Sequence, residues 1–426
     1  MNPFPIVAGE LYAEEVPLSR IAAEVGTPVY VYSRAALERN ATAFRDAVAP
    51  LGDPLCAFAV KANPNLAVLR VLAAQGFGAD VVSGGELRRA RAAGIAADKI
   101  VFSGVGKTAA ELTLALEERI GQINIESVEE ADELSAIAAA RGVQAVCALR
   151  VNPDVDAGTH DKISTGKADS KFGVPLAEAV EVYDRMATLP GLAPCGVALH
   201  IGSQLADLAP LERAFTRLGN LVTRLRQKGH AITRVDLGGG LGIPYRQGEM
   251  FPSLADYAAM VARVTRSWDV RLIFEPGRII VGDAGVLLTR VVRVKRGAAN
   301  PFVVVDAAMN DLARPAMYGA WHDFMPVRAS GARMVANIVG PICETGDTFA
   351  TGREIDRLES GDLAVFRTAG AYGATMASSY NSRGFVPEVL VDADRFAVVA
   401  DRIAPDAIMA AERVPDWLSD DAGQAR

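Results

Sequence analysis

Short apolar runs alternate with amphipathic segments from about residue 55 to residue 275. Each run is bounded by Gly, Asn, Asp or other polar residues, which is the pattern of buried β-strands. The runs that we predict to be strands are 56–60, 79–82, 100–102, 122–125, 145–151, 195–199, 234–237 and 271–274.

The segments between these runs are rich in Ala, Leu, Glu and Arg at helical spacing. The predicted helices include 34–48, 65–74, 86–93, 109–118, 129–141, 211–228 and 254–267. Eight strand–helix units over about 250 residues favour a closed (β/α)8 TIM barrel. Periodicity alone also allows an open, doubly wound sheet.

Beyond about residue 282 the pattern changes to short Val-rich runs separated by Gly, Asp and Asn, which predicts a C-terminal β domain. Its expected strands are 286–294, 301–306, 333–339, 362–368, 388–392 and 396–400. The predicted fold class is therefore α/β plus β. We divide the chain into an N-terminal segment packing with the β domain (1–33), the barrel (34–282), the β domain (283–412) and a C-terminal tail (413–426).

Composition excludes several kinds of partner. The chain has 426 residues, half of them hydrophobic, and a net charge of -7 without any basic run. Nucleic acid and anionic membranes are therefore not expected partners, and no apolar stretch reaches membrane-spanning length. The four cysteines, Cys56, Cys147, Cys195 and Cys343, lie far apart in the sequence, which predicts a reduced, cytoplasmic protein.

The first barrel strand ends on Lys61 and the chain breaks at Asn63-Pro64, which places a lysine amine at the rim of a pocket. Apolar surroundings lower the pKa of an amine, and a neutral lysine can attack an aldehyde. A single lysine at a strand end is usually a solvated surface residue. Here polar residues follow the other strands too, at the edge where barrel enzymes keep their sites. They are Asp80, Ser83, Ser103, Glu126, Arg150, His200, Ser203, the glycines Gly238, Gly239 and Gly240, Glu275 and Arg278.

Two motifs resemble nucleotide-binding loops but do not fit them. The run from Gly238 to Gly242 has Ile243 where a dinucleotide fingerprint needs its last glycine. The segment Gly104-Val105-Gly106-Lys107-Thr108 would place the first glycine of a phosphate loop at Val101, inside a strand. The histidines show no paired spacing for a metal, so no metal site is predicted.

The β domain contains four polar or aromatic loops that glycines bracket, and functional residues concentrate in such loops. These loops are 310–318, 340–347, 370–374 and 379–383.

Together these motifs resemble the fold-type III pyridoxal-phosphate-dependent decarboxylases, the alanine-racemase-like and ornithine-decarboxylase-like group. Each motif alone is modest, but the six occur in the order found in that family. They are Phe58-Ala59-Val60-Lys61-Ala62-Asn63, His200-Ile201-Gly202-Ser203-Gln204, Asp236-Leu237-Gly238-Gly239-Gly240, Glu275-Pro276-Gly277-Arg278, Cys343-Glu344-Thr345-Gly346-Asp347 and Gly370-Ala371-Tyr372-Gly373. The sequence departs from the family at Gly384, where proline is usual.

The resemblance implies that pyridoxal 5'-phosphate (PLP) is the cofactor and that Lys61 binds it covalently. Asp80 and His200 would contact it, with His200 against a face of its ring, and Glu275 would face the pyridine nitrogen. A carboxylate there favours the protonated ring, which is the stronger electron sink. The phosphate would be held by Ser203, Gly238, Gly239, Gly240, Gly277, Arg278 and Tyr372.

For the substrate, the resemblance implies a small amino acid with a second carboxylate, meso-2,6-diaminopimelate, which is decarboxylated to L-lysine. Arg278, Arg314, Tyr318 and Tyr372 would bind it, since guanidinium matches carboxylate well, and Glu344 would bind its distal amine. Decarboxylation of ornithine, arginine, lysine or carboxynorspermidine stays an alternative, as does a non-catalytic PLP-binding regulator.

The same resemblance implies a homodimer with active sites shared across the interface. Cys343 would act in catalysis beside Lys61 and His200, reaching the site of the other subunit together with Glu344.

Overall fold

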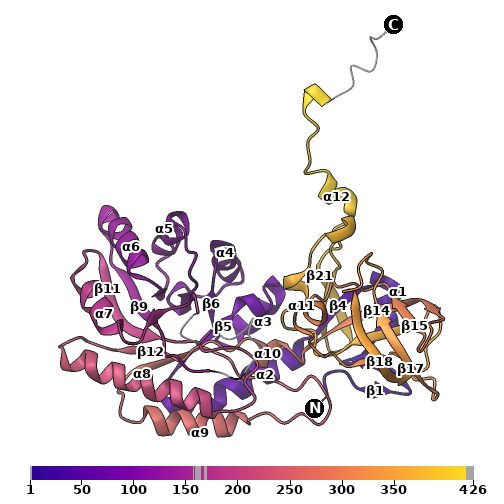
Figure 1. The fold of residues 1–426 in the computed structure, drawn as a ribbon, viewed down its shortest axis with the longest axis horizontal. Helices are drawn as coiled ribbons and strands as arrows, with labels where there is room; N and C mark the ends of the chain where they lie inside the picture. The colour runs from indigo at the N-terminus through magenta and orange to yellow at the C-terminus, as the bar shows by residue number, and fades with distance from the viewer. Residues whose placement is uncertain (1, 157, 159–164, 167–169, 419–426) are drawn as a thin grey trace.

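The computed structural model describes residues 2–156, 158, 165–166 and 170–418. The chain forms a barrel with surrounding helices and, beside it, a β domain built largely from the C-terminal part of the chain (Figure 1). Of the expected tail 413–426, residues 419–426 lie outside the described part. The domain limits given above stay a prediction.

The barrel consists of eight parallel strands that close on themselves. Each strand pairs with the next one in the sequence, and pairing of β13 with β5 completes the ring. This closure excludes the open sheet. The strands are β5 (Leu55–Ala59), β6 (Gly78–Val81), β7 (Ile100–Phe102), β8 (Gln122–Ile125), β9 (Ala145–Asn152), β11 (Leu192–Ala198), β12 (Arg234–Asp236) and β13 (Arg271–Phe274). The two-residue β10 (Val174–Pro175) extends the end of β9.

Helices surround the barrel and turn their apolar stripes toward it. Several begin at a side chain that caps the first turn: Ser83, Thr108, Ser127 and Ser253 each accept a backbone N–H. The helices are α2 (Arg34–Val48), α3 (Leu66–Ala74), α4 (Gly84–Ala92), α5 (Ala109–Glu117), α6 (Val128–Arg141), α7 (Ala179–Thr188), α8 (Ala209–Gln227), α9 (Leu254–Thr265) and the short α10 (Arg278–Val281). Short 3-10 turns lie at η1 (Ala49–Leu51), η2 (Val60–Ala62) and η3 (Ala97–Lys99).

The β domain is organised around the long strand β14 (Gly285–Lys295), which pairs with β4, β15 and β19. Its other strands are β15 (Phe302–Val305), β16 (Phe324–Pro326), β17 (Arg333–Val339), β18 (Thr348–Asp356), β19 (Leu363–Phe366), β20 (Glu388–Asp392) and β21 (Arg395–Ala400). It also carries the helices α11 (Arg314–Tyr318) and α12 (Pro405–Met409) and the turns η5 (Ala374–Met376), η6 (Tyr380–Ser382) and η7 (Asp416–Leu418).

The N-terminal segment joins this domain through β4 (Val29–Ser33), which lies between β14 and β20. Both faces of β4 are buried: Val29 and Val31 belong to a core inside the β domain, whereas Tyr30 and Tyr32 belong to the core shared with the barrel. The segment also contains β1 (Ile6–Val7), β2 (Glu10–Ala13), β3 (Val16–Pro17) and α1 (Leu18–Val25).

Gly384 has a local structural reason. A Cβ atom at this position would lie 2.0 Å from the backbone oxygen of Ile403. A proline would need the same Cβ, so this chain has no room for it without moving residue 403.

Candidate active site

Lys61 lies in the η2 turn directly after β5, with its amine close to the neighbouring strand β6. Its Nζ donates a 2.6 Å hydrogen bond to Oδ2 of Asp80. Asp80 is fully buried, and its second oxygen, Oδ1, has no hydrogen-bond partner. Burial alone would lower the pKa of Lys61, but the Asp80 carboxylate together with Glu275 and Tyr372 outweighs burial, and the pKa is raised. The expectation of a lowered lysine pKa is therefore wrong for the protein without a bound aldehyde.

The Lys61 turn is held by a loop of the β domain. The backbone N–H of Tyr372 donates to the oxygen of Ala62 at 2.8 Å, and the side-chain amide of Asn63 donates to the oxygen of Gly370 at 3.0 Å. Close packing requires glycine at 370, because a Cβ there would lie 1.9 Å from the oxygen of Val281. These contacts place the Tyr372 ring beside the lysine.

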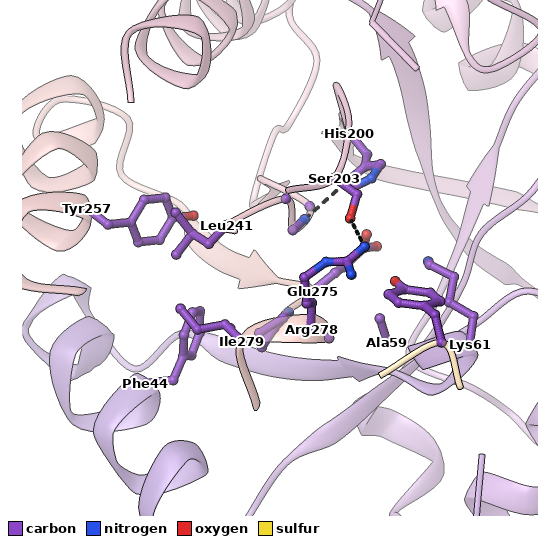
Figure 2. Close-up of a pocket in the computed structure, with 16 residues that line it drawn as sticks. Phe44, Ala59, Lys61, His200, Ser203, Leu241, Tyr257, Glu275, Arg278 and Ile279 are labelled. Carbon is purple, nitrogen blue, oxygen red and sulfur yellow. Dashed lines mark hydrogen bonds between the residues drawn. The ribbon is translucent and has the colours of Figure 1, made fainter. Parts of the chain in front are cut away.

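His200 follows β11, and its ring is fixed by the glycine run after β12. The backbone N–H of Gly239 donates to Nδ1 of His200 at 3.2 Å (Figure 2). Since Nδ1 accepts a hydrogen bond, the ring proton is on Nε2. Burial, together with Lys61 and Arg150, lowers the pKa of His200 well below its usual value, so the ring is neutral.

The three glycines after β12 are needed where the ends of neighbouring strands converge. Cβ atoms at Gly238, Gly239 and Gly240 would lie 2.4, 2.2 and 2.6 Å from backbone oxygens of adjacent segments. Gly238 and Gly240 also have positive φ angles of 65° and 117°. The run therefore brings bare backbone to the mouth of the barrel.

Glu275 follows β13 and is buried next to Asp236 at the end of β12. Burial and the nearby carboxylates Asp236 and Asp80 raise the pKa of Glu275 well above its usual value, and burial raises the pKa of Asp236 to about 6. Ser103 adds a long hydrogen bond of 3.4 Å to Glu275. Burial and the repulsion between the two carboxylates thus both favour protonation of this pair.

Arg278 crosses the pocket from the first turn of α10. Its Nη2 donates to Oγ of Ser203 at 3.1 Å (Figure 2), and its Nη1 donates to the hydroxyl of Tyr245 at 2.6 Å. Its Nε is buried without a hydrogen-bond partner. Gly277 precedes Arg278. A Cβ atom at Gly277 would lie 3.1 Å from the Cβ atoms of Ala59 and Ala62, so the backbone packs closely there.

A cavity of about 530 Å³ continues from this pocket toward the β domain. Arg314 and Tyr318 of α11 line it together with Lys61, Arg278 and Tyr372. Sequence reasoning missed Tyr245 and Trp321, which also line it. Their aromatic side chains in polar loops were the available signal.

Two predicted site residues are not brought to this site. Cys343 and Glu344 are exposed on the loop between β17 and β18. Neither lines the pocket around Lys61 or the cavity of about 530 Å³ that continues from it. Within the described residues no group of three or more His, Cys, Asp or Glu could hold a metal ion.

The residues present fit pyridoxal phosphate. The Ser203 hydroxyl and the bare backbone of the glycine run and of Gly277 suit a phosphate. The Lys61 amine suits an aldehyde, and its Asp80 and Glu275 neighbours suit a ring nitrogen that gains a proton.

A sequence model of the family described as "Pyridoxal-dependent decarboxylase, pyridoxal binding domain" matches residues 34–282. Fold and site thus define a pyridoxal-dependent decarboxylase. A diaminopimelate decarboxylase of Zymomonas mobilis is 50% identical over 421 residues, which is 98% of this chain and 100% of that protein. The chain belongs to the diaminopimelate decarboxylase family.

Solved structures agree with this membership. The diaminopimelate decarboxylase of M. jannaschii in complex with L-lysine superposes with a TM-score of 0.94 at 35% identity, covering 97% of this chain and 98% of that one. The Helicobacter pylori enzyme, also complexed with L-lysine, gives 0.89 at 37% identity, covering 92% and 98%.

Proposed function

We propose that the protein uses PLP, bound through Lys61, to decarboxylate meso-2,6-diaminopimelate to L-lysine and carbon dioxide, the last step of lysine biosynthesis. The observation that carries this proposal is the pair of buried arginines, Arg278 and Arg314, in the same cavity as Lys61. Neither is paired with a carboxylate in the part of the chain that the structure describes. Two such cations beside the lysine fit a substrate that brings a second carboxylate.

The residues proposed to hold the cofactor are supported by their place around one pocket beside Lys61. Lys61 would bind its aldehyde group, and the phosphate would be held by Ser203, Tyr372 and the backbone of Gly238, Gly239, Gly240, Gly277 and Arg278. Bound PLP supplies the electron sink that accepts the electron pair left on the substrate carbon when carbon dioxide departs.

The protein's own groups then hold protons and position the substrate. Glu275 and Asp236 keep a proton next to the place of the ring nitrogen, and Asp80 holds the Lys61 amine. Neutral His200 offers its Nε2–H to a face of the cofactor ring without adding a charge. The hydroxyl of Tyr318 and the guanidinium of Arg314 receive the distal end of the substrate.

The alternatives are less well supported. Ornithine, lysine, arginine and carboxynorspermidine lack a second carboxylate at the distal end. They therefore do not match two arginines that have no carboxylate partner within the described residues. A lysine/ornithine decarboxylase of Vibrio vulnificus is only 19% identical, which supports the fold alone. A non-catalytic regulator has no need to keep Lys61, Cys343 and Tyr372 together.

We further propose that the protein is a homodimer in which Cys343 and Glu344 complete the site of the other subunit. Cys343 would place a proton at the reacting carbon, and Glu344 would bind the distal amine. The exposure of both side chains supports this proposal, because a lone chain leaves them outside its cavity. All four cysteines are free, which fits a reducing, cytoplasmic location. Within the described residues, none of the helices combines the length and apolarity that crossing a bilayer requires.

The experiment is a substrate comparison. Purified protein loaded with PLP is offered meso-diaminopimelate, ornithine and lysine separately, and release of carbon dioxide is followed. We expect release from diaminopimelate with L-lysine as product. Faster release from ornithine or lysine would overturn the substrate assignment.

A further inference from the structure

The distal arginine Arg314 is bound by a neutral partner rather than by a carboxylate. Its Nη1 lies 2.8 Å from Nε2 of His322. Both residues are buried, with 6% and 2% of their surface exposed. A buried guanidinium usually pairs with a carboxylate, so a histidine in this place is unexpected.

The protonation of His322 follows from its two contacts. Its Nδ1 lies 2.8 Å from the backbone oxygen of Arg367, which can only accept, so the ring hydrogen is on Nδ1. Nε2 is then a lone pair and accepts from Arg314. Burial, and next Arg314 itself, lower the pKa of His322 to about 3, so the ring stays neutral at working pH.

Tyr245 is the corresponding partner of the other arginine. Its hydroxyl accepts a hydrogen bond from Nη1 of Arg278. The face of its ring lies against Arg314, whose Cζ is 4.3 Å from the centre of the Tyr245 ring. The rings of Tyr245 and His322 meet edge to face at 5.2 Å. The two aromatic side chains therefore form one support for both guanidinium groups.

The backbone that carries His322 is itself fixed. Helix α11 ends at Gly319, whose positive φ of 59° turns the chain back toward Arg314. Arg353 donates to the oxygen of His322 and stacks on Trp321 at 3.5 Å from the ring centre. His322 is thus held in place independently of any ligand.

A neutral acceptor fixes a guanidinium without cancelling its charge. A carboxylate in the place of His322 or Tyr245 would do both, and a substrate carboxylate would then have to compete with it. We propose that His322 and Tyr245 are positioning residues for substrate selection, which orient Arg314 and Arg278 as neutral hydrogen-bond acceptors and leave both charges for the substrate's distal carboxylate. This inference rests on the proposed function.

A comparison of L-lysine binding with cadaverine binding distinguishes this positioning role from a general structural role of His322 and Tyr245. The carboxylate that lysine retains is the one that did not react, so L-lysine carries the distal carboxylate and cadaverine lacks it. Calorimetry of the PLP-loaded protein with L-lysine and with cadaverine therefore isolates the contribution of the distal carboxylate to binding, without any turnover.

We expect His322→Leu to weaken L-lysine binding about tenfold or more, since a hydrogen bond to a charged group is lost, while cadaverine binding stays unchanged. The loss in diaminopimelate turnover should fall mainly on KM rather than kcat. His322→Gln, which keeps a neutral acceptor, should recover part of the affinity. His230→Gln is the control, because His230 contacts Asp184 outside the site, and it should change neither amine.

Tyr245→Phe keeps the ring under Arg314 and removes only the acceptor of Arg278, so it carries the test if His322→Leu does not fold. Equal weakening of both amines in folded variants, or no weakening of either, would overturn the inference. Failure of the wild-type protein to decarboxylate diaminopimelate would instead overturn the proposed function.

Discussion

Glu126 is a residue at which the change of one side-chain atom is expected to lower stability strongly. It directly follows β8, and only 2% of its side chain is exposed. Its Oε1 accepts from Arg150 at 2.6 Å and from the backbone N–H of Gly104 at 2.8 Å. Its Oε2 accepts from the backbone N–H of Gly173 at 2.9 Å. Every one of these partners is a donor.

Glu126→Gln replaces one acceptor oxygen by a donor in a place surrounded by donors. If the amide nitrogen faces Gly173, the partly buried N–H of Gly173 loses its acceptor, and if it faces Arg150, the charged pair is broken. Loss of the charge-assisted bond costs about 1.5–3 kcal/mol and the stranded donor about 1–3 kcal/mol. The two contributions together give an expected loss of about 2.5–6 kcal/mol of barrel stability. For a domain of this size that corresponds to a fall in Tm of about 10 °C.

The assay is thermal unfolding of the protein followed by circular dichroism, for wild type, Glu126→Gln and Glu133→Gln. Glu133 is exposed on the neighbouring helix α6, so the same chemical change there should leave the Tm nearly unaltered. If Glu126→Gln had the same Tm as the Glu133→Gln control, the argument that these donors depend on the carboxylate would be refuted.

Three further predictions concern the chemistry. Borohydride reduction of the PLP-loaded protein should place the pyridoxyl group on Lys61, and recovery of the label on Lys107 or Lys171 would remove Lys61 from its role. Arg314→Ala should raise the KM for diaminopimelate by about 30-fold or more and leave the cofactor absorbance intact; an unchanged KM would take Arg314 out of the substrate site. Lys61→Ala and Cys343→Ala should each be nearly inactive, whereas co-expression should restore roughly a quarter of wild-type activity, because half of the dimers are mixed and each has one intact site. Mixed dimers without activity would contradict the shared site.

The barrel could be predicted because its strands are buried on both faces and therefore appear as continuous apolar runs. All eight expected runs are strands. The eight strand–helix units favoured a closed barrel, and this is confirmed, but the pattern could not exclude an open sheet, since closure depends on pairing between β13 and β5, which are more than 200 residues apart in the sequence. Strand β18 was missed because it contains Gly352, Arg353 and Glu354 and exposes much of one face.

The strand pattern alone could predict the site residues whose place follows from their own strand, whereas the roles of Arg314, Tyr318 and Tyr372 were expected only from the family resemblance. Lys61, His200, the glycine run and Glu275 all follow barrel strands, and the structure brings them together. The pKa of Lys61 was predicted in the wrong direction because its partner Asp80 lies on the next strand, where only the fold brings it near. His322 could not be predicted for a similar reason, since its role depends on the turn at Gly319.

The loop of Cys343 and Glu344 is exposed but firmly held, and this combination argues for a partner. Asp347 at the end of the loop is buried and accepts from the backbone N–H groups of Met309 and Ile342 at 2.7 Å each. A loop that serves only as a surface connection has no need of a buried carboxylate to fix it. Asp347 also ties the loop to the segment leading into α11. In the β domain, Tyr372 and Arg314 therefore line the cavity beside the barrel of the same chain, whereas Cys343 lies on an exposed loop that hydrogen bonds hold in place. We infer that this loop serves a second copy of the chain, whose cavity likewise has no cysteine among the described residues that line it.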